Sequence, residues 1–125
     1  MSVLPRVTVY VRVFPNRFVV RHIESGKEAI VDSAPAFTTR RLLIGEFIPA
    51  AESLRTAFRQ VLPKGPLVAA PVVVMHQTTL TEGGLSGVEE RVLLEVASHA
   101  GAKRTVIWVG QDLQDAEVEE KARAA

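Results

Sequence analysis

Few side chains in this 125-residue sequence have the type and position that chemistry requires. His76 ends a continuous apolar run that begins at Pro71, and α/β proteins place functional groups where such strands end. Three acids could accompany it, namely Glu46, Glu89 and Asp112. We regard these four residues as the candidates for a site in which acids converge near a histidine. We otherwise expect no catalytic, cofactor-binding or metal-binding residue.

Each candidate also has a purely structural interpretation. His76 fits a hydrogen-bonded histidine at the end of a buried strand. Ser86 and Glu89 have the Ser-x-x-Glu spacing of a capping box, in which the hydroxyl and the carboxylate satisfy free backbone N–H groups. His22 and His99 lie on other predicted elements, so no set of residues has the spacing of metal ligands. On this interpretation the polar residues support the fold.

Other signatures of activity are missing. Gly83-Gly84 lacks the following Lys-Ser/Thr of a phosphate-binding loop. No serine lies in a nucleophile elbow. The cations Arg40, Arg41 and Lys64 fit a solvated surface, and the net charge of +1 provides no general attraction to nucleic acid or to an anionic membrane. We therefore expect no nucleic-acid partner.

The composition is typical of one soluble domain. Of the residues, 47% are apolar and 23% are charged, and 125 residues are enough to bury a core. The absence of cysteine excludes disulfides and fits a reducing compartment. The first residues lack the basic segment and apolar core of a signal peptide, and the longest apolar run, Leu67 to Met75, is too short to span a bilayer. We expect a single domain over residues 1–125, cytoplasmic and without a transmembrane segment.

The first quarter of the chain predicts a meander of three antiparallel strands. Residues Val7 to Val13 alternate between valine and polar residues, as a half-buried strand does. The turn formers Pro15 and Asn16 separate this strand from a second one over Phe18 to Glu24. A turn at residues 25–27 leads to a third strand over Glu28 to Asp32.

The rest of the chain predicts alternating helices and strands. A helix begins near Pro49 and ends before Pro63, a buried strand runs from Pro71 to His76, a helix capped by Ser86 ends at Gly101, and a strand covers Thr105 to Val109. The buried helix faces are predicted to contain Ile48, Ala51, Leu54, Phe58 and Val61 in the first helix, and Val88, Val92, Leu93, Val96, Ala97 and Ala100 in the second. Phe58 and Trp108 are expected in the core. Residues 111–125 are mostly charged and predict a poorly anchored C-terminal helix or tail.

This order of elements, β-β-β-α-β-α-β, resembles the ribonuclease H-like core that forms each half of the actin-like ATPases. The residues resemble in particular the first half of the bacterial rod-shape protein family MreB. Pro71 to Met75 looks like that family's strand, Gly87 to Arg91 like its Val-Glu-x-Arg helix start, and His99 to Lys103 like its Ala-Gly-Ala helix end. The segment Leu43 to Phe47 and the helix after it look like the family's Ile-Ala-Asp-Phe segment. The resemblance implies an α/β half-domain with a mixed five-stranded sheet.

The same comparison indicates what has been lost. Actin-like ATPases carry Asp-x-Gly-Thr at the end of the first strand, where the glycine lets the backbone wrap phosphates and the aspartate manages magnesium. Here Arg12 stands in place of the aspartate and Phe14 in place of the glycine, and Pro15 has no N–H to offer. The second half, which completes the nucleotide cleft, is absent. The resemblance therefore implies no cofactor, no ATP binding and no ATPase activity.

Two functions remain on these grounds. The favoured one is a non-catalytic MreB-like half-domain that acts by protein–protein contacts, with itself or with a cytoskeletal or envelope-associated protein, in the machinery of cell shape. The alternative is a ribonuclease H-like or actin-like phosphotransferase or nuclease completed by a partner chain. The alternative predicts acids near His76, yet the first strand and the strand Val72 to Met75 carry none. In the actin-like family that the chain resembles, acids at the start of the equivalent helix help to position an attacking water, and Glu89 lies near that point.

Overall fold

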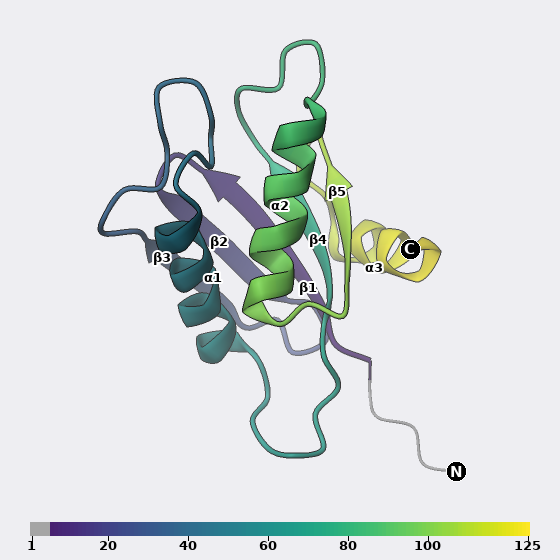
Figure 1. Ribbon diagram of the computed structural model, residues 1–125. Coiled ribbons are helices and arrows are strands. Elements are labelled where there is room, and N and C mark those ends of the chain that lie inside the picture. Colours follow the sequence, from purple (N-terminus) through teal and green to yellow (C-terminus); the bar gives the residue numbers. More distant parts are fainter. Residues whose placement is uncertain (1–5) are drawn as a thin grey trace.

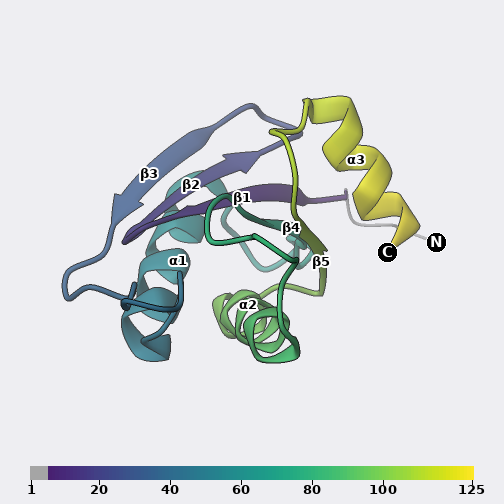
Figure 2. The same ribbon diagram turned by 90° about the horizontal axis from the view of Figure 1, so that it is seen from above.

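The computed structural model describes residues 6–125, which form one mixed sheet with helices on both faces (Figures 1 and 2). Residues 1–5, on which the expectation of no leader rests, lie outside the described residues. The elements are β1 (Thr8–Phe14), β2 (Arg17–His22), β3 (Glu28–Asp32), α1 (Phe47–Val61), β4 (Val72–Gln77), α2 (Gly87–Ala100), β5 (Arg104–Trp108) and α3 (Asp115–Ala124). None of these helices has the length and apolar content needed to cross a membrane.

The sheet has the strand order β3-β2-β1-β4-β5. Strands β1, β2 and β3 pair antiparallel, as the two short turns predict, while β4 lies parallel to both β1 and β5. Each parallel connection contains a helix, because parallel neighbours need a crossover. The predicted mixed sheet of five strands is confirmed. All six residues of β4 are buried, as its uninterrupted apolar run indicates.

Helices α1 and α2 cover one face of the sheet and α3 covers part of the other (Figure 2). The alternation in β1 sends Val9, Val11 and Val13 into the larger core under α1 and α2. Tyr10 points to the opposite face, where it packs with Val74 in a smaller cluster. The strand is therefore buried on both sides rather than half-buried.

The two helices bury slightly different faces from the predicted ones. Ile48 is 62% exposed and Val88 is 65% exposed, although both were expected in the core. At about 100° per residue, Ile48 lies roughly 120° around the axis from Leu54, and Val88 lies roughly 140° from Leu93. Leu54 and Leu93 are at most 1% exposed and mark the true centres of the buried faces. Phe58 is in the core as expected, whereas Trp108 is only half-buried.

The ends of α2 follow the sequence signals closely. The Ser86 hydroxyl accepts a hydrogen bond from the Glu89 N–H at 3.2 Å, and the Glu89 carboxylate accepts one from the Ser86 N–H at 2.9 Å. Gly101 ends the helix with a φ of 114°, in the left-handed region that favours glycine. The predicted capping box and helix end are both confirmed.

The expectation of a poorly anchored C-terminal segment is wrong. Within α3, Val118 is 0% exposed and Ala122 is 1% exposed. Val118 packs with Tyr10, Ile23 and Val74. These residues lie on the side of the sheet away from α1 and α2, which we call the outer face. The sequence gives only a weak signal for this contact, because it is made by isolated apolar residues in a charged segment. The helix thus closes one side of the molecule over β1, β4 and β5.

Candidate functional site

The polar residues of the outer face gather where the chain passes from β5 to α3. His76 lies near the carboxyl end of β4, and its side chain is 1% exposed. Tyr10 reaches it from β1, and the segment that follows β5 brings Gly110 and Asp112 alongside. Parallel strands normally bind ligands at this carboxyl edge. A ligand-binding site is therefore expected at this edge of the sheet.

Both ring nitrogens of His76 are hydrogen-bonded. Nε2 lies 2.8 Å from the Gly110 carbonyl oxygen, which can only accept, so Nε2 carries the proton. Nδ1 of the neutral ring must then accept, and the Tyr10 hydroxyl donates to it at 2.7 Å. The Tyr10 oxygen in turn accepts from the Leu113 N–H at 3.1 Å. The result is a closed chain of hydrogen bonds that ties the β5–α3 connection to β1 and β4.

Burial favours the neutral forms of His76 and Tyr10, the two titratable residues of this hydrogen-bond network. It lowers the pKa of His76 below the ordinary value, and the Gly110 carbonyl and the Asp112 carboxylate oppose part of that shift. Burial also raises the pKa of Tyr10, against the effect of the Leu113 N–H. Both directions favour the hydrogen-bond pattern described, in which neither ring is charged. The Nδ1 lone pair of His76 is already occupied by the hydrogen bond from the Tyr10 hydroxyl.

The lowered pKa of His76 predicts a pH-dependent stability. In the unfolded chain the ring has a pKa of about 6.5. Below that pH the unfolded state binds a proton on His76 more readily than the folded state does. The free energy of unfolding is therefore unaffected by His76 above about pH 6.5 and falls as the pH drops toward the pKa of the folded state. The loss should reach at most about 1.4 kcal/mol per pH unit. Urea unfolding at several pH values measures it.

A His76→Gln variant is the control for this pH dependence. Glutamine can donate to Gly110 and accept from Tyr10, but it does not titrate. Its free energy of unfolding should therefore change less between about pH 5 and 7 than that of the unaltered chain. Equal slopes for the two chains would contradict the assignment to His76.

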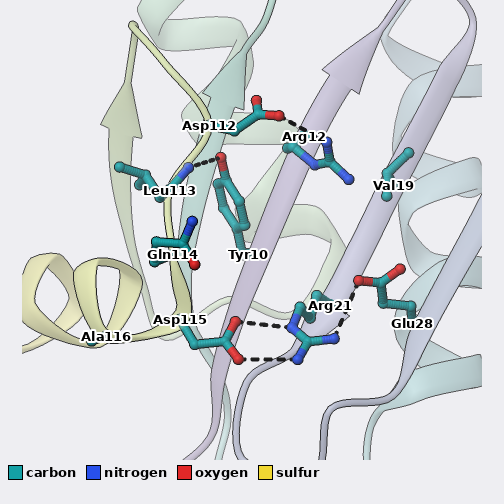
Figure 3. Close-up of a pocket in the computed structure, with 10 residues that line it drawn as sticks. All are labelled: Tyr10, Arg12, Val19, Arg21, Glu28, Asp112, Leu113, Gln114, Asp115 and Ala116. Carbon is teal, nitrogen blue, oxygen red and sulfur yellow. Dashed lines mark hydrogen bonds and ion pairs between the residues drawn. The ribbon is translucent and has the colours of Figure 1, made fainter.

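A groove of about 530 Å³ lies beside this network, between the outer face of the sheet and the start of α3 (Figure 3). Charged side chains line it, and they pair with one another. Arg12 contacts Asp112 at 3.2 Å, while Arg21 contacts Asp115 at 2.9 Å and Glu28 at 3.2 Å. The Arg21–Asp115 pair is bidentate, which lowers the pKa of Asp115. The groove is concave enough to hold a small molecule, but its arginines are already paired with its carboxylates.

The structure brings together only two of the four candidate residues. Asp112 Oδ1 lies 3.9 Å from His76 Nδ1, although its side chain is 67% exposed and pairs with Arg12. Glu89 caps α2, and Glu46 precedes α1, so both belong to the helical layer on the other face of the sheet. The carboxylates therefore do not converge on His76.

Tyr10 is the residue of this cluster that the sequence did not point to. Its place among the outward positions of β1 fitted a solvent-exposed residue, yet it is 5% exposed. The one available signal was that it is the only tyrosine of the chain and lies on a strand otherwise rich in valine.

Among residues 6–125, no three His, Asp or Glu side chains gather closely enough to hold a metal ion.

Two solved structures have a similar architecture. A non-polymerising mutant of MamK bound to AMPPNP matches 86% of this chain with a TM-score of 0.62 and 13% sequence identity. MreB 5 of Spiroplasma citri bound to AMPPNP matches 82% with a TM-score of 0.54 and 11% identity. The chain spans only 42% and 38% of those two proteins. It therefore has the fold of one actin-like, ribonuclease H-like half-domain, and the expectation of that fold class is confirmed.

The sequence itself has a nearer relative. The chain is 37% identical over 105 residues to the Escherichia coli (strain K12) protein YjaA, described as uncharacterized, and the match covers 80% of this chain and 77% of YjaA. The protein therefore belongs to the YjaA family. No protein-family model matches the chain.

Proposed function

We propose that this protein is a non-catalytic, MreB-like half-domain that binds other proteins and no longer binds nucleotide. Its partners are a second copy of the chain or a component of the cytoskeletal and envelope-associated machinery that sets bacterial cell shape. The actin-like fold supports this proposal at the level of architecture. The conformation of the β1–β2 turn is the single observation that carries it.

By the resemblance to the actin-like ATPases, the β1–β2 turn corresponds to their phosphate-binding loop. Here its polar groups form hydrogen bonds within the protein itself. Asn16 accepts hydrogen bonds from the N–H groups of Phe37 and Thr38 at 2.9 and 2.8 Å. Its own N–H donates to the Thr38 hydroxyl at 2.9 Å. Pro15 has no N–H. A phosphate at this turn would thus meet no free ring of backbone donors of the kind that cradles phosphates.

The side chains around the turn support the same interpretation. Arg17 pairs with Asp32 at 2.6 Å, and Arg12 pairs with Asp112. The carboxyl edge of the sheet, where a ligand would lie, is instead occupied by the β5–α3 connection through Gly110 and its neighbours. The backbone of this chain thus covers the edge at which parallel strands normally bind ligands.

Strand β3 offers a surface for pairing with another protein. It is hydrogen-bonded only to β2, so one edge remains open among the described strands. The N–H of His22 bonds to Lys27 and that of Ser33 to Asn16, and the alternation of antiparallel pairs then leaves the backbone of residues 28, 30 and 32 facing outward. Ile30 is 60% exposed at the centre of this edge. An open edge with an exposed apolar residue favours strand addition.

Sedimentation of a charged edge variant tests the proposal. The unaltered chain should associate as its concentration rises, and Ile30→Lys should weaken this association about tenfold or more, because a lysine on an edge opposes strand pairing. Leu67→Lys is the matched control, since Leu67 is 77% exposed but lies in the loop after α1. A strict monomer that also captures no partner from cells would refute the proposal.

The nucleotide part of the proposal has its own readout. Mg-ATP should leave the backbone amide signals of residues 13–17 unchanged in NMR spectra, because their donors are engaged within the protein. Shifts concentrated in this turn, with saturation, would overturn the loss of nucleotide binding.

A further inference from the structure

Three cations line one concavity at the end of the molecule opposite His76. A surface concavity of about 540 Å³ lies between the β2–β3 turn and the carboxyl end of α1. Its basic side chains are Lys27, Arg59 and Lys64, and no aspartate or glutamate lines it. The sequence grouped Lys64 with Arg40 and Arg41 as solvated surface. The fold instead places Lys64 with Arg59, at the end of α1, and with Lys27, which is distant in sequence.

These three cations differ from the arginines on the sheet. Arg12, Arg17 and Arg21 each pair with a carboxylate. None of the ion pairs between described residues includes Lys27, Arg59 or Lys64. Like charges placed together repel, so the cluster carries a cost that a bound anion would remove. The carboxyl end of α1 offsets part of that cost, because helix dipoles favour cations there.

The backbone that presents the cations is well ordered by hydrogen bonds. In the β2–β3 turn, the Ser25 hydroxyl accepts from the Lys27 N–H at 3.1 Å and contacts His22 Nδ1 at 2.6 Å. The His22 N–H donates to the Lys27 carbonyl at 2.8 Å. Arg59 stands on the last turn of α1. The backbone that carries two of the three cations is therefore ordered before any ligand arrives, which lowers the entropic cost of binding.

We propose that this concavity binds a soluble small molecule that carries two adjacent phosphate groups. A phosphate group carries about −1.5 to −2 charges near pH 7, so one group leaves the three cations incompletely compensated and two groups match them. The planar fork of Arg59 suits two phosphate oxygens, and the lysines act as point charges. No aromatic residue lines the concavity to stack on a nucleobase. The chemistry that is recognised is the diphosphate.

This inference does not depend on the proposed function. The concavity lies at the β2–β3 turn, and the position of the lost phosphate loop lies at the β1–β2 turn, at the other end of the antiparallel pair. A diphosphate ligand could regulate a binding module without restoring any nucleotide chemistry. NMR separates the two proposals, because each predicts shifts in a different set of residues.

The test is a titration with inorganic pyrophosphate followed by NMR at near-physiological ionic strength. Saturable shifts are expected at Lys27, Arg59, Gln60 and Lys64. The double variant Lys27→Gln/Lys64→Gln should weaken binding by about tenfold for each cation removed. The side chains are exposed, so the variants should fold normally. Lys103→Gln is the matched control for each of the two substitutions made singly, because it removes one charge from an exposed position outside the concavity.

Four results would overturn the proposal. The first is the absence of saturable binding, and the second is an equal loss in Lys103→Gln, which would indicate a general charge effect. The third is binding to vesicles that contain phosphatidylglycerol without binding to free pyrophosphate, since a lipid surface would then be the source of the phosphate. Binding that survives the double variant would place the ligand elsewhere and refute the site as well.

Discussion

Replacing Val118 by aspartate is expected to lower the free energy of unfolding by about 3 kcal/mol or more, because the carboxylate would lie unpaired in an apolar cluster. Val118 is 0% exposed and packs with Tyr10, Ile23 and Val74. The chain can escape this cost by undocking α3. Urea denaturation measures the first effect, and amide hydrogen exchange in residues 115–124 measures the second.

The control for this prediction is Ala116→Asp in the first turn of the same helix. Ala116 is exposed, and a negative charge near a helix amino end is favourable, so its stability should change by less than about 0.5 kcal/mol. If both variants behaved alike, α3 would not be anchored through Val118. The charged C-terminal segment would then be the poorly held tail that its composition suggests.

Replacing Tyr10 by phenylalanine should destabilise the protein by about 1–3 kcal/mol, although it removes a single oxygen. The hydroxyl donates to His76 and accepts from the Leu113 N–H, so both partners would be left without it. An unsatisfied buried polar group costs more than its hydrogen bond contributes when made. Urea denaturation gives the free energy, and the exchange rate of the Leu113 amide should rise.

Thr8→Val provides a matched control on the same strand and the same face. Its hydroxyl is fully buried but has no hydrogen-bond partner. Replacing it with the isosteric valine should therefore be neutral or stabilising. A Tyr10→Phe variant as stable as the unaltered protein would show that the chain of hydrogen bonds contributes little. Opposite signs for the two substitutions would confirm that hydrogen bonding, and not burial of a hydroxyl, decides the outcome.

The polar network bears directly on what the protein can do. In an actin-like half-domain the carboxyl edge of the sheet faces the ligand, but here His76 and Tyr10 hold the β5–α3 connection across it. The charges of the neighbouring groove are compensated by Asp112, Asp115 and Glu28. Both ring nitrogens of His76 are engaged in these hydrogen bonds.

Much of the fold could be predicted because it is written in local patterns. The valine alternation defines β1, the turn formers Pro15 and Asn16 define the first hairpin, and Ser86 with Glu89 defines the start of α2. Each signal acts over a few residues, so it needs no knowledge of distant neighbours. The resemblance to actin-like half-domains followed from the order of these elements, and the departures at Arg12 and Phe14 were also visible in the sequence.

Tertiary structure alone decided the rest. It set which faces of α1 and α2 are buried, with Ile48 and Val88 left exposed, because the position of a helix on a sheet depends on the whole interface. It docked α3 through Val118. It also gathered Lys27, Arg59 and Lys64 into one concavity. The candidate acids Glu46 and Glu89 were separated from His76 by the sheet, while Tyr10, 66 residues away in sequence, became its partner. Sequence spacing determines local structure, but the distance between remote side chains is fixed only when the sheet and its helices have packed.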